Sequence, residues 1–222
     1  GLFLWSPSLV HAQKSSYTVN LSFTGYMTSI LVRVSKKPAM SFQLSKRGNL
    51  LWFNIGIGES TLLLTPRGRL FPRLISSSSK AGMVYDSSQR LVAFGDLRFL
   101  YTPTLSHLKT IKWGTTKLGI QYDSTNRIKS IGSYQFRYSL MGVVSHIKNT
   151  EVEYNAQGIV TKIGSLKIVY HHHGKVHSAG GIRLKYNSLN HRVLALLGSD
   201  PKTKVRILWY NENCIFQTRM YK

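Results

Sequence analysis

The sequence is poor in acidic residues, nearly devoid of cysteine and free of long apolar runs. Cys214 is the only cysteine among 222 residues, so no disulfide can form within the chain. No stretch reaches the roughly 18 consecutive apolar residues that a transmembrane helix needs, and we expect no such helix. Runs of strong helix formers are also missing, so helix should be a minor part of the fold.

The shortage of acids leaves few groups for catalysis. The sequence contains eight Asp and Glu residues, and two of them, Asp86 and Asp123, occupy predicted turn positions. Neither a glycine-rich phosphate loop nor an arrangement of nucleophile and base stands out. We therefore predict a protein that is not an enzyme and that needs no cofactor.

Basic residues dominate the charge balance. Thirty Lys and Arg residues give a formal net charge of +22. Self-repulsion on this scale is offset when the surface meets an anionic partner. We expect an acidic protein complex, a surface polysaccharide or lipid head groups, and nucleic acid is a further candidate. The alternative is a general compositional bias towards Lys and Arg, with no partner behind it.

Residues 1–13 resemble the end of an export signal. Pro7 interrupts an apolar run, and Val10-His11-Ala12 before Gln13 has the small-residue pattern of a cleavage site. We expect an exported protein, located in the periplasm, on an outer surface or outside the cell. The alternative is that these residues form an ordinary first strand and that the protein is cytoplasmic.

Tyrosines recur at a fixed spacing through the second part of the chain. Five of the seven gaps between successive members are 16 residues long, which indicates an internal repeat. The series is Tyr85, Tyr101, Tyr122, Tyr138, Tyr154, Tyr170, Tyr186 and Tyr210.

Each unit of this repeat contains two turn signals separated by short alternating segments. The first follows the tyrosine, where Gly158 and Gly174 occupy positions that require a positive φ. Gly132 and Gly164 supply the second turn half a period later. One period therefore predicts one β-hairpin with two strands of roughly five residues.

The units Tyr85-Asp-x-x-Gln-Arg-Leu91 and Tyr122-Asp-x-x-Asn-Arg-Ile128 resemble the YD repeats of Rhs-type proteins. The resemblance is loose and covers about residues 85–210. It implies a long antiparallel meander that coils into a shell or spiral, with a structural or surface role and no intrinsic activity. The repeat units of this sequence are shorter than is usual for that family.

We expect an all-β protein whose hairpin repeats form a coiled meander or shell. A barrel-like closure and a β-solenoid with one turn per repeat are the alternatives. The predicted divisions are an apolar leader over 1–13, N-terminal strands over 14–43, degenerate repeats over 44–84 and regular repeats over 85–222. Exposed terminal strands could also make the chain a homo-oligomer, a filament or lattice subunit, or part of a larger assembly.

Basic residues recur at similar places in successive units. If the repeats stack in register, these residues form a ladder that suits an extended polyanion, with an affinity that falls as salt rises. The alternative is a set of charges that keep the sheet from aggregating. The predicted ladder comprises Arg127, Lys129, Arg137, Lys162, Lys167, Lys175, Arg183 and Lys185.

Histidines cluster on one predicted turn. Imidazoles there could hold Zn²⁺ or Ni²⁺, and the candidate ligands are His171, His173 and His177. Adjacent turn residues rarely converge on one ion, and no cysteine or carboxylate accompanies them. We therefore predict solvated turn residues and no metal site.

Overall fold

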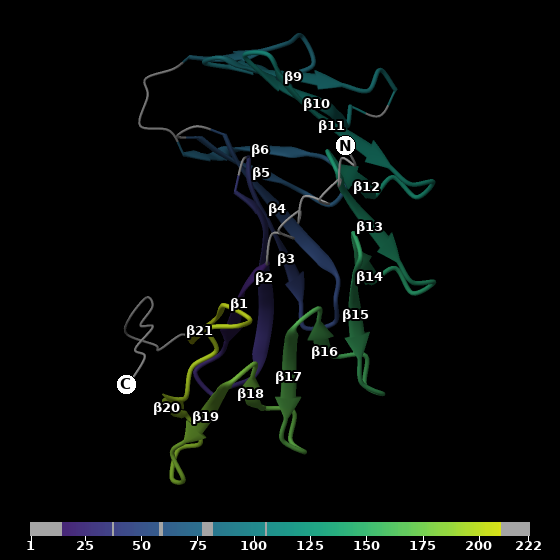
Figure 1. Ribbon diagram of the computed structural model, residues 1–222. Coiled ribbons are helices and arrows are strands. Elements are labelled where there is room, and N and C mark those ends of the chain that lie inside the picture. The colour runs from purple at the N-terminus through teal and green to yellow at the C-terminus, as the bar shows by residue number, and fades with distance from the viewer. Residues whose placement is uncertain (1–14, 37, 58–59, 77–81, 105, 210–222) are drawn as a thin grey trace, which may run out of the picture.

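The computed structural model describes the chain except for residues 1–14, 37, 58–59, 77–81, 105 and 210–222. The leader-like segment and Tyr210 therefore lie outside the described residues. The described part of the chain is all-β and contains no helix, as its composition predicted. It accordingly holds no helix that could cross a membrane. The strands form two sheets, which are antiparallel apart from one parallel pair (Figure 1).

The first sheet has seven strands and is built mainly from the N-terminal part of the chain. Six strands follow one another as an antiparallel meander. The seventh comes from the far end of the described chain and pairs in parallel with the first. In spatial order the strands are β21 (Val205–Trp209), β1 (Ser16–Leu21), β2 (Met27–Lys36), β3 (Ala39–Ser45), β4 (Leu50–Ile57), β5 (Ser60–Leu64) and β6 (Leu70–Ser76).

The second sheet has 14 strands in strict sequence order. Figure 1 shows it bending along one side of the first sheet, from β9–β11 at one end to β18–β20 at the other. Its strands are β7 (Met83–Tyr85), β8 (Leu91–Phe94), β9 (Leu97–Tyr101), β10 (Leu108–Trp113), β11 (Thr116–Tyr122), β12 (Ile128–Ile131), β13 (Tyr134–Tyr138), β14 (Val144–Ile147), β15 (Thr150–Tyr154), β16 (Val160–Ile163), β17 (Leu166–Tyr170), β18 (Val176–Ala179), β19 (Ile182–Tyr186) and β20 (Val193–Leu197).

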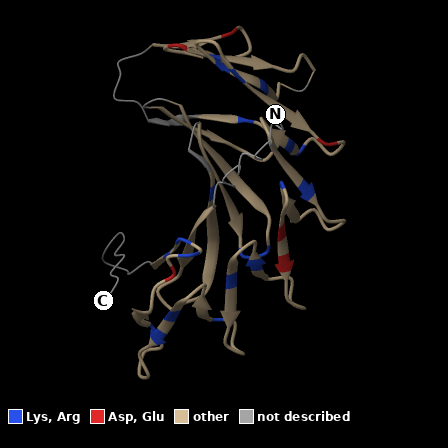
Figure 2. Ribbon diagram, viewed as in Figure 1, with Lys and Arg blue, Asp and Glu red and all other residues tan. Residues whose placement is uncertain are grey.

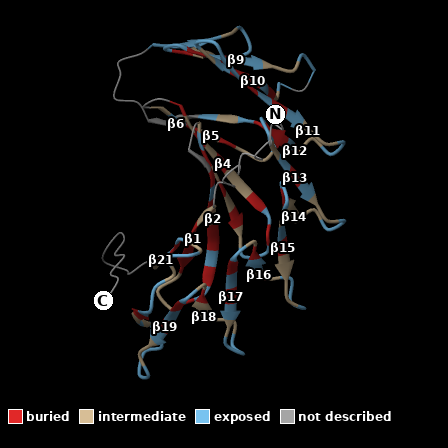
Figure 3. Ribbon diagram, in the orientation of Figure 1, coloured by how far each residue is buried: buried red, intermediate tan, exposed pale blue. Residues whose placement is uncertain are grey.

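The core lies between the two sheets. Strands of both sheets alternate buried and accessible side chains, so each sheet turns one apolar face inward (Figure 3). Phe136 of the second sheet packs edge-on against Phe42 and Phe53 of the first, with ring centroids 5.5 and 5.1 Å apart. All three rings are buried. This packing leaves the other face of the 14-stranded sheet accessible to solvent.

Turns of the first sheet interlock with turns of the second. The turns at 22–26, 45–49 and 65–69 each accept backbone hydrogen bonds from two strands of the second sheet. The donors are the amides of residues that open those strands, so each turn of the first sheet is held between two hairpins of the second. The pairs are Leu108 to Gly68, Ile128 to Pro66, Val144 to Gly48, Val160 to Lys46, Val176 to Gly25 and Val193 to Phe23.

The recurring tyrosines close this junction. The hydroxyl of Tyr138 donates to the carbonyl of Ile128 at 2.7 Å, and that of Tyr170 donates to the carbonyl of Val160 at the same distance. Tyr154 and Tyr186 make the equivalent bonds to Val144 and Val176. Tyr101 and Tyr122 likewise bond Leu91 and Leu108. A residue such as Val160 is thus bound through its amide to the first sheet and through its carbonyl to a tyrosine.

These hydroxyls make the fold sensitive to alkali. Burial raises the pKa of Tyr101, Tyr154 and Tyr186 from 10.0 to about 12. The unfolded chain then loses these protons first, so stability is complete below pH 10 and falls as pH rises towards about 12. Urea unfolding at a series of alkaline pH values should show this decline, together with late phenolate absorbance in the folded protein. Stability that stays constant across that window would contradict the assignment.

Candidate functional site

The accessible face of the 14-stranded sheet carries many of the basic residues. Its strands place Lys and Arg at alternate positions, as in β17 and β19, where buried or partly buried apolar residues flank each exposed cation. Figure 2 shows basic residues spread over this sheet, while acidic residues are few. The face therefore has a predominantly positive character.

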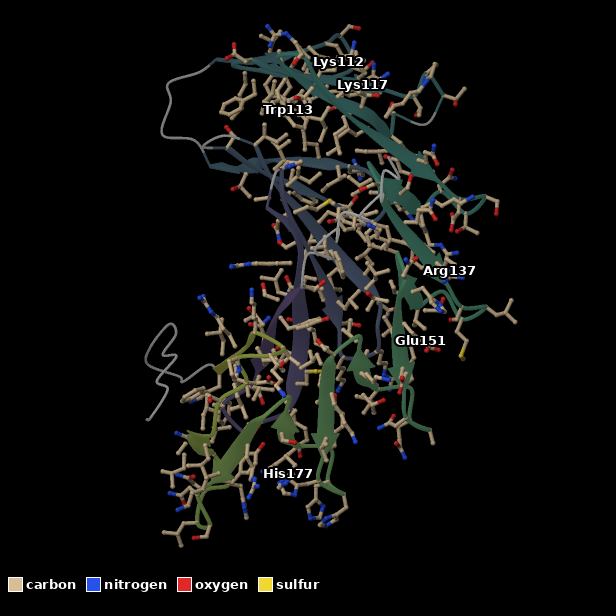
Figure 4. All side chains as sticks on the ribbon, in the orientation of Figure 1. Lys112, Trp113, Lys117, Arg137, Glu151 and His177 are labelled. Carbon is tan, nitrogen blue, oxygen red and sulfur yellow. The ribbon has the colours of Figure 1, made fainter. Side chains whose placement is uncertain are left out.

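Three cations stand side by side where β9, β10 and β11 meet. The register places Lys112 directly opposite Lys117 on one side and Arg98 on the other. All three residues are exposed. We call Arg98, Lys112 and Lys117 the cationic row, and Figure 4 labels both lysines. Side chains directly opposite one another on neighbouring strands have Cβ atoms about 5 Å apart, so these charges repel.

A tight turn produces the lysine pair. Gly114 adopts a φ of 52°, and with Thr115 it forms a two-residue connection between β10 and β11. Trp113 pairs with Thr116 across the turn, which puts Lys112 opposite Lys117 one step further along the strands. Trp113 packs against the core. Because side chains alternate between the two faces of a sheet, the pair Lys112 and Lys117, one position further along the strands, faces solvent.

Arg98 is fixed in place by its own hairpin. Its guanidinium donates to the carbonyls of Gly95 and Leu97, which fixes one end of the planar group. Arg has five N–H donors, so further donors remain for an anionic ligand. The row thus combines one oriented guanidinium with two ammonium groups.

The carboxylates of the described residues are mostly engaged elsewhere. Three ion pairs occur in this part of the chain, joining Asp86 to Arg90, Asp123 to Arg127 and Glu153 to Lys162. Asp200 instead accepts the backbone amides of Gly181 and Thr203. None of these interactions involves the cationic row.

Two of the ion pairs belong to turns. The Asp86 side chain accepts the amides of Ser88 and Arg90, and its other oxygen accepts the Arg90 guanidinium at 2.7 Å. This guanidinium bond is the main reason that the pKa of Asp86 falls below its ordinary value. Asp123 and Arg127 repeat the arrangement, and the Arg127 guanidinium lies 4.2 Å from the centroid of the Tyr138 ring. These arginines therefore stabilise turns.

The structure divides the predicted basic ladder into two groups. Arg127 and Lys162 form the internal ion pairs above, and Lys175 donates to the carbonyl of His191 at 3.1 Å. The others are exposed and take part in none of the three ion pairs. They are Lys129, Arg137, Lys167, Arg183 and Lys185.

Sequence reasoning did not identify the cationic row, although part of its signal is visible. The stretch Lys112-Trp-Gly-Thr-Thr-Lys117 has a glycine turn with one lysine on each side, at a spacing that pairs them in a hairpin. Arg98 has no such local signal. Its position opposite Lys112 depends on a register shift between β9 and β10.

Histidines on the β17–β18 turn and in β18 make two close contacts, and one of them joins the rings of His172 and His173, with centroids 3.4 Å apart. His177 Nδ1 and His171 Nε2 lie 3.3 Å apart, and the two rings meet nearly edge-on. Burial is the largest cause of a lowered pKa at His171, and the neighbouring histidines add to it. Among the described residues, no group of three or more His, Cys, Asp and Glu side chains is placed to hold a metal ion.

A cleft of about 910 Å³ lies beside β1 and β21. Arg33, Lys204 and Arg206 contribute positive charge to its lining, and Asp200 contributes the one carboxylate among the described lining residues. That carboxylate is occupied by the loop amides described above, so it serves the loop.

No protein-family model matches the chain, and no curated protein matches it either.

Proposed function

We propose that the chain is a non-enzymatic β-repeat scaffold, related to YD-repeat proteins, whose outer face binds an extended anionic polymer. In this proposal the 14-stranded meander is one wall of a coiled shell. The protein is exported, as the pattern in residues 1–13 suggests, and its partner is an acidic polysaccharide of the cell envelope or of an outer surface.

The cationic row carries the proposal. Lys112 lies directly opposite Lys117 on one neighbouring strand and Arg98 on the other. Like charges in such positions destabilise a sheet by a few tenths of a kcal/mol or more. Asp86, Asp123 and Glu153 are ion-paired elsewhere. Asp96 is exposed two residues before Arg98, takes part in none of these three ion pairs, and can balance at most one of the three charges of the row. An anionic ligand would relieve the repulsion, and charges spaced by one strand match a polymer with charges at regular intervals.

The tyrosines favour a polysaccharide over single-stranded nucleic acid. Proteins that bind single strands stack bases on accessible aromatic rings. Here six tyrosines of the series pack against the core and donate their hydroxyls to backbone carbonyls, while Tyr85 is exposed. The six are Tyr101, Tyr122, Tyr138, Tyr154, Tyr170 and Tyr186. Nucleic acid therefore remains the alternative partner, with the phosphate backbone as its only point of recognition.

Binding to heparin, used as a model sulfated polymer, tests the proposal. We expect affinity to fall steeply with salt, and the joint change Lys112→Gln with Lys117→Gln to weaken binding about tenfold. The salt dependence should fall by about one unit of log–log slope per lysine removed. The control is Lys46→Gln with Arg47→Gln, which removes the same charge from exposed turn residues outside the row.

Equal losses in the two double variants would show that binding depends on net charge alone and would contradict the proposal. RNA and vesicles of anionic lipid serve as competing ligands. Tighter binding of RNA than of heparin at the same salt would favour the intracellular alternative.

A filament or lattice subunit is a second candidate, favoured by the ends of the 14-stranded sheet. β7 and β20 are its outermost described strands, and both expose apolar side chains. Met83, Val84 and Tyr85 are exposed on β7, as are Leu194 and Leu197 on β20. Such edges can pair between chains. Electron microscopy of the purified protein would show ordered polymers if they do, and monomeric particles at high concentration would exclude this role.

A further inference from the structure

We propose that His171 and His177 form a two-histidine binding site for a divalent transition metal, with Zn²⁺ as the reference ion. The proposal goes beyond polyanion binding and does not depend on it. It rests on the distance between two ring nitrogens and on the positions that the two residues occupy in their hairpin.

The geometry matches a shared metal ion. Two nitrogens bound to one tetrahedral Zn²⁺ at about 2.1 Å stand about 3.4 Å apart. His171 Nε2 and His177 Nδ1 lie 3.3 Å apart without any metal. One proton bridging them can therefore be replaced by a metal ion with little movement of the rings. Water completes the coordination, because the described residues supply no third His, Cys, Asp or Glu ligand there.

The two positions are brought together by a β-bulge. Tyr170 pairs with Val176 and Val169 pairs with Ser178, so His177 is the extra residue between the two pairs. A bulge redirects the extra side chain, and here it meets the first residue of the preceding turn. His171 is that residue, since its carbonyl accepts the Gly174 amide and its amide donates to Lys175.

His171 departs from the usual residue of its turn position. At the same position in other hairpins, Asp86, Asp123 and Asn155 use a side-chain oxygen to accept two backbone amides of the turn. Imidazole is a poorer substitute for that cap. A residue that weakens the turn therefore coincides with a second histidine at the bulge, and metal binding gives both a shared role.

Lys175, four residues after His171 in the same hairpin, carries a charge that opposes a bound cation. Its ammonium donates to the carbonyl of His191 and lies 5.8 and 5.4 Å from the ring centroids of Tyr26 and Tyr186. The His191 carbonyl and the two tyrosine rings hold the ammonium and partly compensate its charge. Because both ligands are imidazoles, the site favours a borderline metal such as Zn²⁺ over a hard cation such as Mg²⁺.

Calorimetric titration of the full chain with Zn²⁺ tests the site. We expect one Zn²⁺ per chain, and a loss of affinity of at least about tenfold in both His171→Ala and His177→Ala, since losing a ligand costs no less than losing its outer-shell support. The joint change His172→Ala with His173→Ala is the control, because it removes two exposed imidazoles of the same turn. Binding that follows the His172 and His173 changes instead, or that is absent from the unmodified protein, would overturn the proposal.

Moving the two histidines to another hairpin tests whether their positions, and not the number of histidines, create the site. Asn155 and Thr161 occupy the equivalent turn and bulge positions one hairpin earlier. Asn155→His with Thr161→His, made in a chain lacking His171 and His177, should restore Zn²⁺ binding. A folded variant that fails to bind would contradict the claim that these two positions create the site. Ring ¹⁵N shifts should also identify Nε2 of His171 and Nδ1 of His177 as the bound nitrogens in the unmodified protein.

Discussion

Gly48→Ala should lower the free energy of unfolding by about 3–5 kcal/mol, because two costs add at this position. Gly48 has a φ of 73°, which disfavours any side chain. A Cβ atom there would also overlap the Tyr154 hydroxyl and lie 2.7 Å from its ring carbons. The same residue accepts the Val144 amide, so a displaced turn weakens the junction between the sheets. Urea unfolding followed by circular dichroism measures the loss.

Gly158→Ala is the matched control for that change. Gly158 has a similar φ of 70°, but a Cβ atom there meets nothing within 4 Å. It should therefore lose only the backbone cost of about 1–2 kcal/mol. Adding Tyr154→Ala should recover part of the Gly48→Ala loss in a double-mutant cycle. Equal destabilisation at the two glycines would show that the turn of the first sheet does not pack on Tyr154.

Phe136→Ala should cost about 3–5 kcal/mol, which is typical of removing a buried aromatic side chain. Phe136 contributes the second sheet's ring to a cluster with Phe42 and Phe53 of the first. Its loss leaves a cavity at the centre of the packing between sheets. The free energy of unfolding from urea titration is the measurement.

Leu140→Ala provides the comparison for Phe136→Ala. Leu140 is fully exposed at a turn, so its truncation should change stability by no more than about 0.5 kcal/mol. A Phe136→Ala variant that loses less than about 1 kcal/mol would contradict the packing of the two sheets through this ring.

The all-β class could be predicted because it depends on local patterns. Alternation of apolar and polar residues in segments such as 134–138 and 166–170 indicates strands without any knowledge of tertiary contacts. Turn positions such as Gly158 are also local, since they require a positive φ. The packing of Gly48 on Tyr154 is not local. It joins residues more than 100 positions apart, and the sequence around either residue gives no indication of its partner.

The candidate site was only partly predictable for the same reason. The exposed face of the 14-stranded sheet follows from alternation, and six residues of the predicted ladder are exposed, five of them outside the three ion pairs. The internal role of Arg127 was missed, although Asp123 four positions earlier, like Asp86 before Arg90, carries the signal of a paired turn. Arg98 could not be placed, since a register shift decides which residue it faces. Long-range register therefore limits what the sequence reveals.

Mapping a bound sulfated oligosaccharide by NMR tests the central claim most directly. In a titration of the labelled chain with a heparin fragment, the largest shift changes should fall on Arg98, Lys112 and Lys117 and on their neighbours in β9–β11. The turn that carries Lys46 and Arg47 should change little. Changes centred on that turn, or spread evenly over all exposed Lys and Arg residues, would contradict a binding face on the 14-stranded sheet.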